Sequence, residues 1–499
     1  MLTNRLALRT VSVALLTASA AAAAHVDEVG TFDVTLDPDV FEGPFSGKIF
    51  VAFAKGEEPR SAMHGWFGAP PVLRFEVVDA KGALELSAAT AAAGYPIDWT
   101  EVAAGEEWEV QVVARRSRTG RSAGLSPGDV YSDVASIVYD ADAKGSVELR
   151  LDRVVEPEVF EGSERVELFE FVSPSLSEFH GFEYTMRAGV RLPASAKDGE
   201  RHPVLYSVTG FGGTYDSIFD WENRSEGSAL DECIVVVPDA SNLYGHSVFC
   251  DSDSIGPWGK ALVHELIPAL EAKYGGAGPK HRYVTGGSSG GWSALWLQVA
   301  YPAEFAGCWS HVPDPIDFHD FQQINLYEPL PDGTPRNMYV DESGERRPLA
   351  RRNGQVMLYY EDFARREHVL NPGGQIRSFD ATFSPLGEDG TPRRVFDIKT
   401  GVIDHEAAQA WRRYDISHTL LTRWDELEPQ LDGKIRVFAG EVDSFYLEGA
   451  VERFVDLADE AGLLEHMQVE VVPGLPHTLH RAGYEEMIRT IGERWRGDD

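Results

Sequence analysis

The sequence predicts two folded parts: an α/β domain with a doubly wound, mostly parallel sheet, preceded by an all-β, sandwich-like domain. Strand-like runs without intervening helices occupy the chain before about residue 158, and strands alternate with helices after about residue 164. A chain of 499 residues is also too long for one ordinary hydrophobic core. We therefore expect domains at residues 25–158 and 164–499.

Short β-branched and aromatic runs mark the first of these domains. They are separated by Gly, Pro and Asp turns, and no amphipathic helix interrupts them. The region is too short for the blades of a propeller, so a compact β-sandwich is the expected architecture. The runs are KIFVAFA from Lys48, PVLRFEVV from Pro71, EWEVQVVA from Glu107 and SVELRLDRVV from Ser146.

The second domain shows the pattern of buried parallel strands with covering helices. VLYSVTG from Val204 and CIVVVPDA from Cys233 are near-continuous apolar runs, typical of strands buried on both faces. WGKALVHELIPALEAKYG, which follows them, repeats leucine every four residues and predicts a helix. KIRVFAGEVD and MQVEVVPG supply later strands. Between them, residues 313–410 are rich in Pro, Gly and Arg and predict an ordered, cap-like insertion.

Residues 1–24 have the features of a signal peptide. Two arginines precede an apolar run, and a row of alanines offers an A-x-A cleavage site. The uncharged run is shorter than the roughly 20 residues that a membrane-spanning helix needs. We expect export to a secreted or periplasmic location, without a membrane anchor after cleavage.

Charge and ligand spacing exclude several classes of function. The formal net charge of −35 disfavours nucleic acid as a partner, because binding would work against long-range repulsion. The chain has no C-x-x-C pair and no H-E-x-x-H motif, so we expect no metal, and no organic cofactor is required. Three cysteines are too few for a disulfide scaffold, although export would permit one bridge. They are Cys233, Cys250 and Cys308.

The stretch HRYVTGGSSGGWSALW, residues 281–296, places two serines between a predicted strand and a predicted helix. This is where a nucleophile elbow presents its serine, in a turn that accepts only small side chains two positions before and after it. Spacing alone leaves the nucleophile open. The pairs that satisfy the rule are Gly286 and Gly290 around Ser288, and Gly287 and Gly291 around Ser289.

A serine needs a base, and the base needs an orienting acid. In doubly wound hydrolases these follow the serine in the order acid, then histidine, each after a later strand. Asp443 ends one predicted strand, with Glu441 as an alternative acid. His477 follows the last strand, with His480 as an alternative base. The order predicts a Ser-Asp-His triad at one edge of the sheet.

The oxyanion of an ester intermediate needs two backbone N–H donors. Ser289 would supply one if Ser288 is the nucleophile, and Phe211, in the loop of VLYSVTGFGGTY, is the expected second. A glycine-rich loop could instead bind phosphate, but this one lacks the P-loop lysine and hydroxyl.

From about residue 166 to 499 the chain resembles the Putative esterase family of α/β-hydrolases. The family includes S-formylglutathione hydrolases, feruloyl and acetyl-xylan esterases, enterochelin esterases and mycolyltransferases. Its motif G-x-S-x-G-G maps the nucleophile onto Ser288 and implies Asp443 as acid and His477 as base. Thr209 departs from the family pattern at another place, because many members have histidine there, before the glycine of the oxyanion loop. The resemblance is carried by PVLYSVTGFGG, GPWGKALVHELIPALEAKYG, YVTGGSSGGWSALWLQVAYPAEFAG, AGEVDSFYLEGA and VVPGLPHTLH.

This resemblance implies a serine carboxylic-ester hydrolase that forms an acyl-enzyme intermediate, and the predicted signal peptide adds that it is exported. Its expected partner is a small-molecule or carbohydrate-linked ester. Two other functions use the same scaffold. An acyltransferase would have the same triad but exclude water, and a non-catalytic binding protein would keep the fold without the chemistry.

Overall fold

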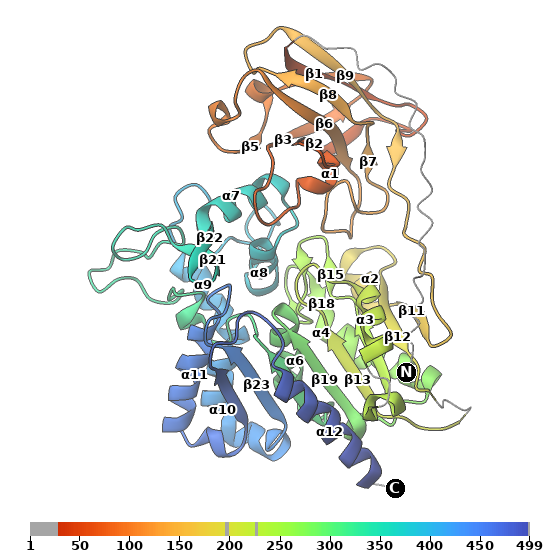
Figure 1. The fold of residues 1–499 in the computed structure, drawn as a ribbon, viewed down its shortest axis with the longest axis vertical. Coiled ribbons are helices and arrows are strands. Elements are labelled where there is room, and N and C mark those ends of the chain that lie inside the picture. The colour runs from red at the N-terminus through yellow and green to blue at the C-terminus, as the bar shows by residue number, and fades with distance from the viewer. Residues whose placement is uncertain (1–27, 195–198, 225–227, 498–499) are drawn as a thin grey trace, which may run out of the picture.

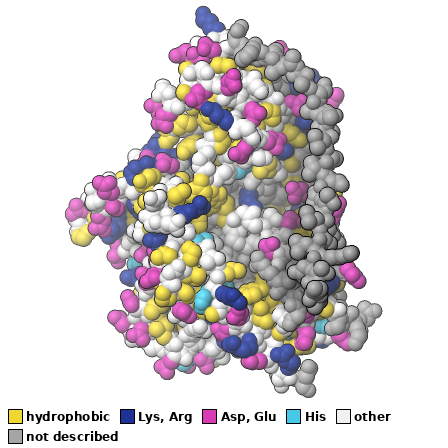
Figure 2. Space-filling view, viewed as in Figure 1, with side chains coloured by type: hydrophobic (Ala, Val, Ile, Leu, Met, Phe, Trp, Pro, Cys, Tyr) yellow, Lys and Arg dark blue, Asp and Glu magenta, His cyan; other side chains and the backbone are white. Residues whose placement is uncertain are grey.

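The structure, a computed structural model, describes residues 28–194, 199–224 and 228–497 (Figure 1). The segment 1–24, for which the sequence predicts a signal peptide, lies outside the described residues. Within the described ranges, no helix combines the length and the apolar character needed to cross a membrane. Acidic side chains are scattered over the face seen in Figure 2, without gathering into one patch.

The N-terminal part of the described chain consists of strands joined by turns. Ten strands form one sheet in the order β4-β1-β8-β6-β2-β3-β5, while β9 pairs with β1 and β7 links β6 to β10. A short helix, α1 (Pro59–Ala62), follows β2. The strands are β1 (Val29–Leu36), β2 (Phe45–Ala54), β3 (Val72–Ala80), β4 (Ala83–Ser87), β5 (Ala93–Tyr95), β6 (Glu106–Arg115), β7 (Val130–Tyr131), β8 (Ala135–Tyr139), β9 (Gly145–Leu151) and β10 (Arg153–Val154).

Strand β2 is buried on both faces, because successive side chains point to opposite sides of a strand. Ile49, Val51 and Phe53 belong to the core of the N-terminal sheet. Phe50 and Ala52 belong to a second cluster, which includes Val369 and Leu370 at the end of α7 (Tyr360–Leu370). The N-terminal sheet is therefore packed directly against a helix from the second half of the chain.

Beyond residue 165 the chain has an α/β fold. An eight-stranded sheet has the order β11-β12-β14-β13-β19-β20-β23-β24. The pairs among β11, β12 and β14 are antiparallel, and the pairs from β14 to β24 are parallel. The strands are β11 (Val166–Val172), β12 (Thr185–Arg191), β13 (Val204–Val208), β14 (Ile234–Pro238), β19 (Arg282–Gly287), β20 (Gly307–His311), β23 (Ile435–Gly440) and β24 (Gln468–Val472).

Helices cover both faces of this sheet (Figure 1), which explains the near-continuous apolar runs of its strands. On one face, Leu205 and Tyr283 pack with Met487 of the last helix. On the other face, Tyr206 and Val284 belong to a larger core shared with the remaining helices. The main helices are α5 (Ile267–Tyr274), α6 (Ser289–Ala300), α10 (Ile416–Leu431), α11 (Glu448–Glu460) and α12 (Arg481–Gly497).

The stretch 313–410 lies between the main sheet and the N-terminal sheet, where Figure 1 shows α7 and α8. It holds a hairpin of β21 (Pro348–Arg352) and β22 (Gln355–Tyr359), followed by α7, α8 (Gln375–Phe383) and α9 (His405–Trp411). Many of its aromatic side chains are buried, which fixes its position on the sheet. These include Tyr339, Tyr360, Phe379, Phe383 and Phe396.

Candidate active site

Ser288 occupies a sharp turn between β19 and α6. Its φ of 59° and ψ of −130° lie in a region that side-chain-bearing residues rarely adopt. A Cβ atom on Gly286 would clash with the carbonyl of Gly290, and one on Gly290 would clash with the carbonyl of Val208. The turn therefore needs glycine two positions before and two after Ser288. Ser289 is the first residue of α6 and is only 1% exposed.

Asp443 and His477 are joined by a hydrogen bond. The imidazole Nδ1 lies 2.8 Å from Asp443 Oδ2, and the Asp443 side chain is almost fully buried. The other carboxylate oxygen of Asp443 accepts from the backbone N–H of Phe445 at 2.8 Å. With Nδ1 bound to the acid, the Nε2 atom of His477 is left for other partners.

The alternative acid and base have other contacts. Glu441 is exposed and accepts from the backbone N–H of Gly474 at 2.8 Å. The ring of His480 lies 5.0 Å from that of Phe438, and its backbone N–H donates to Nδ1 of His311 at 3.3 Å. The geometry therefore pairs Asp443, and not Glu441, with a histidine.

Ser288 and His477 line one pocket of about 320 Å³. This volume is at the low end of small-molecule sites, which span about 300–1,000 Å³. Its lining comes from the main sheet, from the stretch 313–410 and from the β2–β3 connection. Most of these side chains are aromatic or aliphatic. The lining residues are Trp66, Phe67, Gly210, Phe211, Ser288, Asp314, Pro315, Gln322, Leu349, Gln375, Ile376, Phe379, Phe445, Leu447 and His477.

The two residues expected to supply the oxyanion donors lie beside Ser288. A Cβ atom on Gly210 would be 3.3 Å from Ser288 Cβ, so the loop after β13 lies against the elbow. Phe211 follows in this loop, and its N–H donates to no acceptor within the described ranges. Ser289 starts α6, and the first N–H groups of a helix have no partner inside it.

The N-terminal part of the chain reaches the loop after β13 through Arg121. Its guanidinium donates to the carbonyl oxygens of Gly212 and, at 3.4 Å, of Gly213. It also lies 5.8 Å from the centre of the Phe211 ring. No local sequence pattern predicts this contact.

Asp314 is a site residue that the sequence analysis missed. It is 5% exposed, and its Oδ2 accepts from Ser289 Oγ at 2.6 Å. Its Oδ1 lies 3.5 Å from Ser288 Oγ, and among the described residues Ser288 forms no hydrogen bond with His477 in this arrangement. Burial raises the pKa of the Asp314 carboxyl to about 6. The available signal was its place just after β20, at the sheet edge that also carries Asp443.

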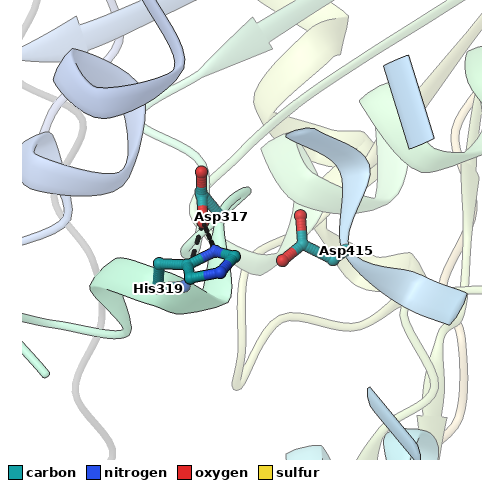
Figure 3. Close-up of side chains that lie close together, drawn as sticks. All are labelled: Asp317, His319 and Asp415. Carbon is teal, nitrogen blue, oxygen red and sulfur yellow. Dashed lines mark hydrogen bonds and ion pairs between the residues drawn. The ribbon is translucent and has the colours of Figure 1, made fainter. Parts of the chain in front are cut away.

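One cluster outside the pocket has the residue types of a metal site. Figure 3 shows His319 turned toward Asp317, with Asp415 beside them. Each carboxylate oxygen already accepts a hydrogen bond, so a cation would have to displace these donors. Asp317 accepts from the N–H and Nδ1 of His319 and from Ser417, and it pairs with Arg453; Asp415 accepts from the N–H groups of His418 and Phe318 and from the hydroxyl of Tyr327. These bonds join the segment before α10 to the segment after β20. The three cysteines are buried and unbridged.

Comparison with known proteins identifies the family. The family described as Putative esterase matches residues 180–483, which is more than half of the chain. The chain belongs to this family. It is thus a carboxylic-ester hydrolase, and the resemblance predicted from its residues is confirmed.

Several solved structures are similar to this esterase. A ferulic acid esterase is 15% identical with a TM-score of 0.40, and the match covers 66% of this chain and 98% of that one. An S-formylglutathione hydrolase from Agrobacterium tumefaciens is 16% identical with a TM-score of 0.39, covering 66% and 95%. The ferulic acid esterase AmCE1/Fae1A from Anaeromyces mucronatus is 14% identical with a TM-score of 0.35, covering 68% and 95%. No curated protein sequence matches the esterase.

Proposed function

We propose that this esterase is an exported serine hydrolase that cleaves small-molecule or carbohydrate-linked esters through Ser288, His477 and Asp443. One observation carries the proposal: His477 is held by Asp443 at 2.8 Å and lines the same pocket as Ser288. Nucleophile, acid and base follow β19, β23 and β24 in that order, as expected for an α/β-hydrolase preceded by a β-sandwich-like unit.

In the proposed reaction, Ser288 Oγ attacks the ester carbonyl and its proton passes to Nε2 of His477. The hydroxyl reaches the imidazole by rotating away from Asp314, and such contacts often tighten only when substrate is bound. Asp443 holds the imidazole in the correct tautomer and stabilises its charged form. His477 then protonates the leaving alcohol, and water, activated by the same histidine, releases the acyl group.

The N–H groups of Phe211 and Ser289 would hold the oxyanion of each tetrahedral intermediate. Each such donor typically contributes about 3 kcal/mol of transition-state stabilisation. The pocket needs no group beyond the chain's own residues for this chemistry. The chain's strong negative charge favours a substrate other than nucleic acid.

The export step of the proposal rests on residues 1–24, which combine two arginines, an apolar run and a row of alanines. The mature chain would start near His25, a few residues before the first strand at Val29. Export would place the esterase in a secreted or periplasmic location.

The proposed function is tested by two adjacent serine variants. We expect Ser288→Ala to lower kcat/KM for a short-chain aryl ester by several orders of magnitude, because the nucleophile is lost. Ser289→Ala should keep much of the activity, since its backbone N–H remains. Equal activity of Ser288→Ala and the unchanged enzyme would refute the proposal, and the reverse order would move the nucleophile to Ser289.

A further inference from the structure

Asp314 places a carboxylate in the apolar pocket beside the nucleophile. Its Oδ2 accepts two hydrogen bonds, from Ser289 Oγ at 2.6 Å and from Gln375 Nε2 at 3.3 Å. Among the described residues, its Oδ1 has only the 3.5 Å contact with Ser288 Oγ. Ordinary hydroxyl hydrogen bonds are about 2.7–2.8 Å long, and bonds to a carboxylate are shorter still. Oδ1 is therefore an acceptor without a strong donor.

Gln375 adds a second unsatisfied acceptor to the lining. Its Nε2 must face Asp314 and Ser289, because a carboxylate can only accept a hydrogen bond. This orientation leaves its Oε1 buried, with no hydrogen-bond partner among the residues described. Buried acceptors without donors are costly, so a bound molecule that brings donors would relieve that cost.

The charge of the pocket also favours a bound molecule that brings a hydrogen-bond donor. Its described lining contains the carboxylate of Asp314 but no lysine or arginine. An ester that reacts at Ser288 develops a negative oxyanion a few ångströms from this carboxylate. The repulsion slows the reaction of a neutral ester, whereas a positive group on the substrate would cancel it.

We propose that the pocket recognises esters that carry an ammonium or hydroxyl group close to the scissile carbonyl, and that Asp314 Oδ1 accepts a hydrogen bond from this group. The proposal rests on the proposed function. The ammonium group is the better ligand, because it both donates and offsets the carboxylate charge. The 3.5 Å separation of Oδ1 and Ser288 Oγ places this donor near the scissile carbonyl, on the acyl or the alcohol side of the ester.

Substrate binding would also free the nucleophile. When the substrate donor takes Oδ1, the Ser288 hydroxyl loses its acceptor there and is available to His477. Recognition and activation would thus use the same carboxylate oxygen. Asp314 touches the substrate in this scheme and contributes directly to specificity.

The test uses three aryl esters of nearly equal volume. In the isobutyryl, lactyl and alanyl esters, the α-carbon carries a methyl, a hydroxyl and an ammonium group in turn. Each kcat/KM is divided by the hydroxide-catalysed rate of the same ester, to remove intrinsic reactivity. We expect the normalised values of the unchanged enzyme to rise in the order isobutyryl, lactyl, alanyl. A 2-aminoethyl ester compared with a propyl ester tests whether the donor sits on the alcohol instead.

Asp314→Asn assigns the preference to the carboxylate. We expect the alanyl-to-isobutyryl ratio to fall roughly ten- to hundredfold, the range for a hydrogen bond to a charged group. The isobutyryl value should change less than the alanyl value, because this ester brings no donor to Oδ1 and the variant also removes the repulsion. Asp459→Asn, which removes one charge from an exposed position on α11, is the matched control and should leave the ratio unchanged.

Three outcomes would overturn the proposal. The first is an unchanged enzyme that shows no preference for donor-bearing esters on either the acyl or the alcohol side. The second is an Asp314→Asn variant with an unaltered alanyl-to-isobutyryl ratio. The third is an Asp314→Asn variant that keeps its fold but loses activity on both esters equally. If Asp314→Asn does not fold, the proposal is tested by whether the unchanged enzyme prefers the donor-bearing esters. Hydrolysis of the isobutyryl ester, lost in Ser288→Ala, reports separately on the proposed function.

Discussion

Glu367 shows how a single buried side chain supports the pocket. It is 7% exposed, and its carboxylate accepts from the backbone N–H groups of Gln375, Ile376 and Arg377 at the start of α8. The N-terminus of a helix favours a negative partner. Burial nevertheless dominates and raises the pKa of Glu367 to about 7. Because α8 carries Gln375, Ile376 and Phe379, this residue helps to fix one wall of the pocket.

The raised pKa of Glu367 predicts a pH-dependent stability. Its pKa is about 7 in the folded chain and about 4.5 when unfolded, so the stabilisation is complete below about pH 4.5 and lost as pH rises through about 7. The difference corresponds to about 3 kcal/mol. Glu367→Gln removes this term. We expect the free energy of unfolding of the unchanged enzyme, relative to this variant, to fall by about that amount from pH 4.5 to 8. Denaturant titrations at several pH values should show this fall. A difference between the two proteins that stays constant with pH would contradict the prediction.

Among single residues, those in local patterns could be predicted and those in long-range contacts could not. The turn at Ser288 and Ser289 could be predicted because it is encoded by adjacent glycines, a strand and a helix, and the family motif selected Ser288 as the expected nucleophile. Asp443 and His477 required only the order of later strands, and the structure joins them at 2.8 Å. Asp314 was missed because a lone aspartate after a strand carries no motif. Its importance depends on Gln375, which lies 61 residues away.

At the scale of elements, the connection between β2 and β3 has the least expected role. It carries Trp66 and Phe67 into the pocket, across from the main sheet. The Trp66 ring lies 4.7 Å from Phe363, 5.6 Å from Phe445 and 6.2 Å from Phe211. No periodicity in this short connection distinguishes it from an ordinary turn, so the sequence could predict the strands around it but not this contact.

Trp66 should therefore affect substrate binding more than the chemical step. We expect Trp66→Ala to raise KM for apolar acyl esters about tenfold or more, with a smaller change in kcat, because burying an aromatic side chain contributes about 1.5–3 kcal/mol. Trp66→Phe should restore most of the affinity. Val78→Ala, at an 81% exposed position of the same sheet, is the control. An unchanged KM for Trp66→Ala, across a series of acyl lengths, would exclude this role.

At the scale of the whole molecule, both parts of the chain line the candidate pocket and are bonded to each other. Arg74 donates to the carbonyl of His368 at 2.6 Å, and Lys48 donates to the carbonyl of Asn371 at 3.1 Å. Each bond joins residues about 300 positions apart in the sequence. Charge-assisted bonds to backbone carbonyls are directional, so they fix orientation as well as contact. The sequence predicted the two parts, but pairings at this separation leave no local pattern.

Arg121 is the point at which the N-terminal sheet reaches the proposed oxyanion hole. Its hydrogen bonds to the carbonyl oxygens of Gly212 and Gly213 hold the peptide groups that follow Phe211. We expect Arg121→Met to lower kcat roughly tenfold or more with little change in KM, since a misplaced oxyanion donor weakens transition-state binding alone. Arg121→Lys keeps one charged donor group, so its kcat should lie between those of Arg121→Met and the unchanged enzyme. Arg118→Met, in the same connection between β6 and β7 but packed on Phe182, is the matched control. A normal kcat in a folded Arg121→Met variant would mean that the main domain alone positions Phe211. A lower kcat that Arg121→Lys partly restores would instead show that the N-terminal sheet helps to hold the oxyanion loop.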